Sequence, residues 1–144
     1  MSIVYQESSF KADARPEREK LLGVIPWFRP SSAVGYSQAL NMTWEDYKNE
    51  TDNLRASRKD FADSADFIGW YASKGYYQGF EKTDARSLYL AYHEGPEGFK
   101  KGSYRSKPWL LGVADKVQRS ANNYRVQFTE CKDELKNPFY FLFN

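Results

Sequence analysis

The sequence has few of the residues from which metal, disulfide and membrane sites are built. Cys131 is the single cysteine and His93 the single histidine, so we expect neither an intramolecular disulfide nor a metal site. No run reaches the roughly 20 apolar residues of a membrane span, and the first residues do not form a signal peptide. The net charge of the protein is +2, far less positive than the concentrated basic charge of a nucleic-acid-binding protein. We therefore expect no metal, no cofactor and no nucleic-acid partner.

Aromatic residues, in contrast, are abundant. They make up 17% of the 144 residues, while hydrophobic residues account for 41% and charged residues for 28%, as in a globular protein. This length predicts a single domain spanning residues 1–144. Most of the rings are expected in its core. The excess predicts that some rings line a surface where they stack on a ligand such as a sugar.

Apolar residues recur at helical spacing in four segments, and we predict an all-α fold. The clearest helix starts near Pro108, and its apolar stripe runs from Leu110 to Phe128. The other three have recognisable ends. The residues expected to begin or end them are Thr43 for the first helix, Asp60 and Gly75 for the second, and Thr83 and Gly95 for the third.

Two segments do not follow this helical pattern. Residues 11–37 contain many prolines and glycines, which predicts a long irregular loop, and its Trp27, Phe28 and Tyr36 are candidates for the wall of a cleft. Residues 137–144 are too apolar for a solvated tail. We expect this tail to pack back on the domain or to contact a partner.

Glu7 is a candidate acid for glycoside cleavage. That reaction needs a carboxyl group that is still protonated near neutral pH, and apolar surroundings raise a carboxyl pKa in this way. Glu7 lies in a mostly uncharged stretch in which Ile3, Val4 and Phe10 supply such surroundings. This pattern alone is not specific, because a glutamate near a helix end is more often solvated.

Three separated segments make the pattern specific when they are taken together. The segments 5–10 (YQESSF), 35–43 (GYSQALNMT) and 91–96 (AYHEGP) occur in this order. They resemble the three signature motifs of the soluble-type lytic transglycosylases, the SLT-domain family, which is related to goose-type lysozyme. The resemblance extends over roughly residues 4–128. It implies a lysozyme-like domain whose helices surround a saccharide-binding cleft.

The resemblance also implies a reaction. Glu7 would be the catalytic acid and base that cleaves the β-1,4 bond between N-acetylmuramic acid (MurNAc) and N-acetylglucosamine (GlcNAc) in peptidoglycan, forming a 1,6-anhydro-MurNAc end. The partner would be a peptidoglycan glycan strand in the bacterial periplasm or cell envelope. Tyr92 would lie beside Glu7, and either Ser31 or Ser32 would be the family's cleft serine. The residues expected to bind substrate are Ser8, Ser32, Tyr36, Gln38, Tyr92, His93 and Glu94.

Several departures from the family leave alternatives open. His93 stands where the family usually has Asn, and Glu94 where it usually has Ala. A second carboxylate beside the cleft would suit a muramidase that adds water, the enzymatic alternative. Only six residues precede Glu7, so we expect that much of the helix carrying it, and any helix before it, is missing from this sequence. That absence makes a catalytically inactive peptidoglycan-binding module a third reading.

Overall fold

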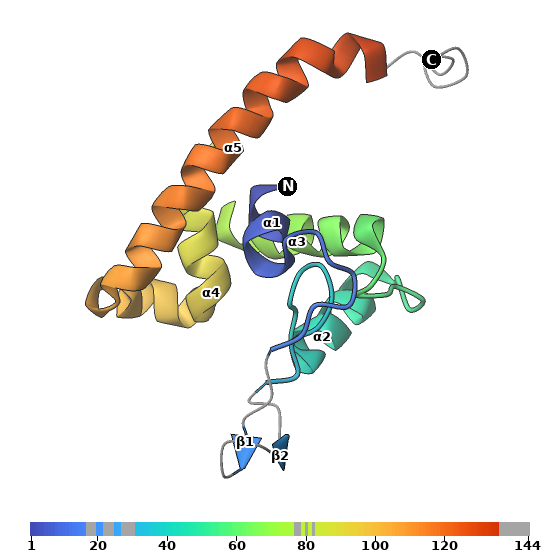
Figure 1. Cartoon of the computed structure of the whole chain (residues 1–144), viewed down its shortest axis with the longest axis vertical. Coiled ribbons are helices and arrows are strands. Elements are labelled where there is room, and N and C mark those ends of the chain that lie inside the picture. The colour runs from blue at the N-terminus through green and yellow to red at the C-terminus, as the bar shows by residue number, and fades with distance from the viewer. Residues whose placement is uncertain are drawn as a thin grey trace.

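Helices account for nearly all of the regular structure in the computed structural model, which describes residues 1–16, 20–21, 25–26, 31–76, 79, 81 and 83–135. The helices are α1 (Ser2–Ser8), α2 (Asn41–Thr51), α3 (Phe61–Tyr76), α4 (Ala85–Lys101), the 3₁₀ helix η1 (Ser103–Ser106) and α5 (Pro108–Leu135). The strands β1 (Lys20–Leu21) and β2 (Ile25–Pro26) form one short antiparallel pair within the loop (Figure 1). The expected all-α fold is confirmed.

Two of the three expected helix N-caps differ from the structure. Asp60 precedes α3 as expected, and its Oδ1 accepts the backbone N–H of Asp63 at 3.0 Å. The expected cap at Thr43 is wrong, because α2 already begins at Asn41. A residue from the loop explains this shift, since the Ser32 hydroxyl accepts the Asn41 N–H at 3.0 Å. A serine remote in sequence therefore satisfies a backbone donor at the start of α2.

Helix α4 bends where the sequence predicted that it would end. Its N-cap is Asp84, one residue after the expected Thr83, and the Asp84 side chain accepts the backbone N–H of Ser87. Gly95 has φ 73° and ψ 163°, which lie outside the helical range. The helix resumes at once because Pro96, with no N–H to satisfy and a helical φ, suits the first position of a new helical segment. It then continues to Lys101.

The core consists of two clusters of buried side chains. The first is formed by α1, α4 and α5, which contribute Ile3, Tyr89, Leu90, Leu110, Ala114 and Val117. The second is rich in aromatic rings and contains Ala39, Trp44, Tyr47 and Phe67, from α2, α3 and the segment before α2. Ile68 and Tyr92 are partly buried and pack against both clusters. These two side chains therefore join the halves of the domain.

Helix α5 is buried only in its first half. Leu110, Ala114 and Val117 are at most 1% exposed, as expected for its apolar stripe. Phe128 is 59% exposed, so the prediction that the buried stripe extends this far is wrong. The reason is visible in Figure 1, where the C-terminal part of α5 extends beyond the other helices. Among the described helices, none is long and apolar enough to cross a membrane.

Some expectations fall on residues that are not described. Trp27 and Phe28, the two rings predicted to line a cleft together with Tyr36, lie outside the described residues. The apolar tail, residues 137–144, also lies outside them. These expectations stay predictions.

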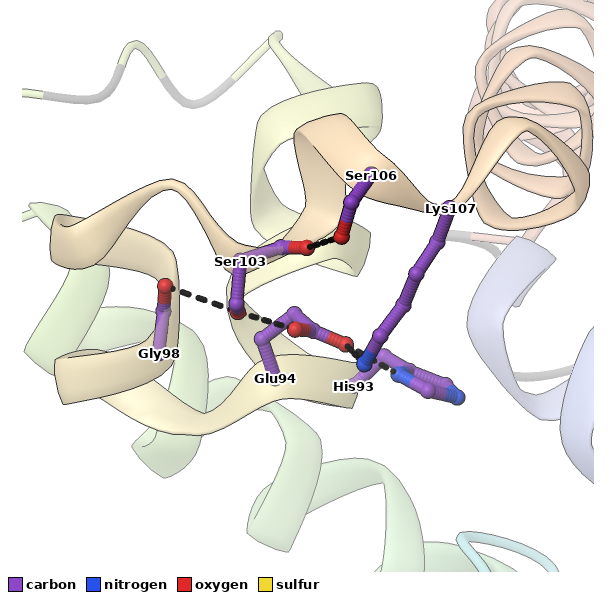
Figure 2. Close-up of polar contacts among 6 residues, drawn as sticks. All are labelled: His93, Glu94, Gly98, Ser103, Ser106 and Lys107. Atoms are coloured by element: carbon purple, nitrogen blue, oxygen red, sulfur yellow. Dashed lines mark hydrogen bonds and ion pairs between the residues drawn. The ribbon is translucent and has the colours of Figure 1, made fainter.

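One buried carboxylate links α4, η1 and Lys107, the residue between η1 and α5 (Figure 2). The Glu94 side chain is only 4% exposed, and its Oε1 lies 2.7 Å from Lys107 Nζ and 3.0 Å from His93 Nδ1. The Ser103 hydroxyl donates to the other oxygen, Oε2. Every oxygen of this buried charge therefore has a polar partner, as a buried carboxylate requires.

The segment before α2 is held by a close backbone approach. The Tyr36 N–H donates to the Arg58 carbonyl at 3.1 Å, and the Gly35 N–H donates to the Ala14 carbonyl at 2.9 Å. Gly35 has φ 78°, and a Cβ atom added there would lie 1.9 Å from the Arg58 oxygen. Only glycine fits this position without moving the backbone of one of the two segments.

Replacing Gly35 with alanine should therefore destabilise the fold by about 2–4 kcal/mol, because a left-handed residue and an overpacked contact are both introduced. Gly112 is the matched control, since it lies inside α5 with no atom within 4 Å of an added Cβ. Gly112→Ala should stabilise the protein by roughly 0.5–1 kcal/mol through helix propensity. Urea unfolding measures both effects. Equal stability of the two variants would contradict the close approach at Gly35.

Part of the protein's stability should depend on pH because of Glu94. Lys107 first, and then Ser103, lower the pKa of Glu94 from 4.5 to about 2. Its contribution to stability is therefore complete above about pH 4.5 and is lost as the pH falls to about 2. The melting temperature of the wild type should exceed that of Glu94→Gln at pH 7, and this gap should narrow over that acid range. A gap that stays constant down to pH 2 would show that Glu94 is not held as its contacts indicate.

Candidate active site

Glu7 lies in the last turn of α1, where tertiary packing holds it in place. Ile3 and Val4 are 8% and 1% exposed, and Ile3 belongs to the buried cluster shared with α4 and α5. The helix ends because Ser9 adopts a left-handed conformation with φ 50°, and its N–H caps the Tyr5 carbonyl. The Glu7 side chain is half-buried. It faces the part of α4 that carries Tyr89.

Burial raises the pKa of Glu7 above its ordinary value. The Tyr89 hydroxyl hydrogen-bonds the carboxylate and the charge of His93 attracts it, and both effects oppose the shift without cancelling it. Burial and the nearby Glu7 charge raise the pKa of Tyr89 in turn. Tyr89 therefore stays neutral and donates its proton to the hydrogen bond. A carboxyl group in these surroundings holds its proton closer to neutral pH than a solvated one.

Tyr92 lies near Glu7, but its hydroxyl has another partner. It donates to the Ser37 backbone carbonyl at 2.6 Å, and its ring packs edge-on against Tyr71 with centroids 5.1 Å apart. Burial and then the negative charge of Glu7 raise the pKa of Tyr92, which places the two residues within electrostatic range. The hydrogen bond to Glu7 comes from Tyr89, one helical turn earlier.

An open cleft of about 300 Å³ lies against Tyr92. It brings together the second and third sequence motifs, which are far apart in the chain. The residues that line it are Gln38, Ala39, Leu40, Thr43, Phe67, Tyr71, Tyr92, His93, Glu94 and Gly95. Glu7 is not among the described residues that line this cleft. Its charge interacts with two residues of the lining, Tyr92 and His93.

Gln38 is fixed in the cleft by its own amide. It has a left-handed backbone with φ 51°. Its Nε2 donates to the carbonyl of Gly35 at 2.8 Å and to that of Ala14 at 2.9 Å. Because the amide nitrogen is used by the main chain, the amide oxygen is the atom through which Gln38 can accept a hydrogen bond from a ligand.

Three other residues from the predicted site are occupied by contacts within the protein. Ser8 is 7% exposed, and its hydroxyl donates to the Val4 carbonyl in its own helix at 3.0 Å. Ser32 is exposed and caps the start of α2. Tyr36 is half-buried, and its ring meets Phe61 edge-on at 5.4 Å. Their roles toward a substrate stay predictions.

Sequence reasoning missed two residues of this site. Tyr89 precedes Tyr92 by one helical turn, so the spacing alone places both on one face of α4 and was a usable signal. Ser37 gave no such signal. It is fully buried, and among the described residues its hydroxyl has no hydrogen-bond partner. An unsatisfied buried hydroxyl usually lowers the free energy of unfolding by about 1–3 kcal/mol. The fold therefore tolerates a loss of stability at Ser37.

The arrangement can perform proton transfer from a single carboxyl group. Burial favours the protonated form of Glu7, Tyr89 can hydrogen-bond the anion that remains when the proton leaves, and the cleft beside Tyr92 provides polar atoms and rings for a ligand. Within the described residues no group of three or more His, Cys, Asp or Glu side chains is placed to bind a metal ion.

Comparison with known proteins identifies the family. The model of the transglycosylase SLT domain matches residues 1–131. No curated protein and no solved structure matches the sequence. The match covers all three motifs together with Glu7, the cleft residues and nearly all of α5. The chain therefore belongs to the transglycosylase SLT domain family.

Proposed function

We propose that this protein is a peptidoglycan lytic transglycosylase in which Glu7 is both the acid and the base. It cleaves the β-1,4 bond between MurNAc and GlcNAc and leaves a 1,6-anhydro-MurNAc end. The observation that carries the proposal is a half-buried carboxyl group with a raised pKa, hydrogen-bonded by Tyr89 and electrostatically coupled to Tyr92 and His93 of an open cleft. Family membership supports the substrate class, and through it a place of action in the bacterial cell envelope or periplasm.

The first step uses the proton that burial keeps on Glu7. The carboxyl group donates it to the glycosidic oxygen, the C1–O bond breaks, and the N-acetyl oxygen of the muramyl sugar bonds to C1 and stabilises the positive charge. Glu7 is now a carboxylate. The Tyr89 hydroxyl donates a hydrogen bond to this anion, and such charge-assisted bonds are the stronger ones.

The second step returns a proton to Glu7. The carboxylate accepts the proton of the sugar's own 6-hydroxyl, whose oxygen attacks C1 and displaces the N-acetyl oxygen. The anhydro ring closes, and Glu7 is ready for another turnover. No water is consumed and no second carboxylate takes part, in contrast to an inverting hydrolase.

The cleft residues would hold the sugar. Gln38 offers its amide oxygen, Tyr92 and Tyr71 offer ring faces and edges, and Thr43 and His93 lie on the same lining. Aromatic and hydrogen-bonding groups together suit a ligand with apolar ring faces and many hydroxyls. Substrate contacts by Ser8, Ser32 and Tyr36 belong to the same proposal, as the sequence motifs suggest.

The contacts of Glu94 favour the lyase over the hydrolysing alternative. A carboxylate that activates water needs an oxygen free to accept the water's proton. Both oxygens of Glu94 are engaged, Oε1 by Lys107 and His93 and Oε2 by Ser103. The low pKa of Glu94, about 2, also makes it a weak base.

Glu7→Gln should lower glycan cleavage by at least about 10²-fold, because the amide cannot donate or accept the reaction's proton. The measurements are turbidity loss of purified cell walls and mass spectrometry of the released muropeptides. Glu50→Gln is the matched control, since Glu50 is an exposed carboxylate that is paired with Lys74 and does not line the cleft. It should cleave as the wild type does.

Three outcomes would contradict parts of this proposal. Retention of most activity in Glu7→Gln would remove Glu7 from the reaction. Ordinary reducing ends among the wild-type products, together with a loss in Glu94→Gln as large as that in Glu7→Gln, would replace the lyase with a hydrolase. A wild-type protein that binds cell walls without cleaving them would be a binding module.

The two tyrosines should respond differently to loss of their hydroxyls. Tyr89→Phe removes the hydrogen bond that lowers the pKa of Glu7, so the alkaline limb of the pH–rate profile should move to higher pH. Its turnover should fall roughly 10-fold, since a hydrogen bond to a charged group contributes about 1.5 kcal/mol or more. Tyr92→Phe instead loses the bond to Ser37 and should cost about 1 kcal/mol of unfolding free energy. Identical pH profiles for Tyr89→Phe and the wild type would show that Tyr89 does not act on Glu7.

A further inference from the structure

His93 lies between two carboxyl groups that come from different helices. On one side, Glu94 Oε1 lies 3.0 Å from its Nδ1. On the other side, its ring contacts Tyr89, with centroids 6.4 Å apart, and Tyr89 in turn hydrogen-bonds Glu7. Trp109 packs edge-on against the same imidazole at 5.3 Å. The ring is therefore held in one place, although its side chain is still 34% exposed.

The contact with Glu94 fixes which nitrogen of His93 carries a proton. An ionised carboxylate only accepts hydrogen bonds, so Nδ1 must be the donor. Figure 2 shows Nδ1 turned toward Glu94 and the other nitrogen, Nε2, at the far end of the ring. Lys107 and Ser103 hold Glu94 on its remaining sides. Glu94 is consequently a rigid anion behind the imidazole rather than a reactive group in the cleft.

We propose that His93 is a positioning residue for Glu7, which Glu94 orients so that the charge of the imidazole acts on the Glu7 carboxyl group beside Tyr89. The inference rests on the proposed function of Glu7 and extends it. Glu94 and Lys107 form an ion pair with each other. Among the described groups that face His93, Glu94 is already stabilised by Lys107, and Glu7 is the second carboxylate on which the imidazole charge acts. Tyr89 stays neutral, and Trp109 has no charge.

The direction of the effect follows from the signs of the charges. A protonated His93 stabilises the Glu7 carboxylate and lowers the pKa of Glu7, against the effect of burial. A neutral His93 leaves burial dominant, and Glu7 keeps its proton to higher pH. The charge of His93 therefore favours the carboxylate form of Glu7, which acts as the base, and opposes the protonated form, which acts as the acid.

His93→Gln tests this inference directly. Glutamine keeps an N–H that can donate to Glu94 but cannot carry a charge. The two readouts are the pH profile of kcat/KM on glycan strands and the carbon-13 NMR titration of the Glu7 side-chain carboxyl group. Both midpoints should move to higher pH in the variant. The comparison is made one pH unit above the alkaline midpoint of the wild type, with the activity of each protein expressed as a fraction of its own maximum. At that pH the fraction should be at least about twofold higher for His93→Gln than for the wild type.

Lys48→Gln is the matched control. It also removes a single positive charge, but on α2, where Lys48 pairs with Glu45. It should move neither midpoint. If His93→Gln does not fold, as judged by circular dichroism, His93→Asn offers a smaller uncharged amide at the same position, and the same two shifts are expected.

Two results separate the failure of this inference from the failure of the proposed function. Unchanged midpoints in both readouts for His93→Gln would overturn the inference while leaving Glu7 as the acid. A shifted Glu7 titration in a protein whose wild type cleaves no glycan would uphold the electrostatic pairing and overturn the proposed function.

Discussion

The candidate site depends on packing that holds one very short helix. Helix α1 has seven residues, and an isolated helix of that length is not stable in water. It exists here because Ile3 and Val4 are buried against the rest of the domain. Burial of these apolar residues therefore also buries Glu7 and brings it to Tyr89. The same contacts determine the position of Glu7, its pKa and its hydrogen-bond partner.

The cleft lies where the two core clusters meet. The aromatic cluster of α2 and α3 forms one wall through Phe67 and Tyr71, and α4 supplies the other. Tyr92 packs against both clusters and also lines the cleft. A change in how the clusters pack would therefore alter the cleft. In the proposed function, substrate binding and the packing of the core would therefore rely on the same side chain, Tyr92.

The all-α class of the fold could be predicted from the sequence, because helices leave local patterns of apolar and capping residues. The helical stripe beginning at Leu110 and the cap at Asp60 are examples. Thr43 was wrongly predicted as a cap because Ser32, remote in sequence, satisfies the donor instead. The exposure of Phe128 could not be predicted, since helical periodicity does not tell where a neighbouring helix stops. Tertiary contacts decided both cases.

In the candidate site, too, local sequence patterns could be predicted and tertiary contacts could not. The sequence motifs suggested Glu7 as the acid, and four of the residues that they predicted to bind substrate line the cleft, namely Gln38, Tyr92, His93 and Glu94. They could not reveal that Glu94 is bound by Ser103 and Lys107, because Ser103 lies on η1 and Lys107 between η1 and α5. Nor could they reveal the buried, unpartnered Ser37 hydroxyl. Such properties arise from several segments at once, and only the folded arrangement contains them.

The bend at Gly95 divides α4 into two halves. In a continuous helix the side-chain directions of both halves would be fixed relative to each other. In an uninterrupted helix each residue is rotated about 100° from the one before, so an insertion anywhere rotates everything beyond it. The break at Gly95 interrupts that regular progression before Pro96. Tyr89 and Tyr92 take their direction from the first half alone. The second half takes its own direction, in which Phe99 packs against the core and the Gly98 carbonyl accepts the Ser103 hydroxyl, so one helix serves two separately oriented sets of contacts.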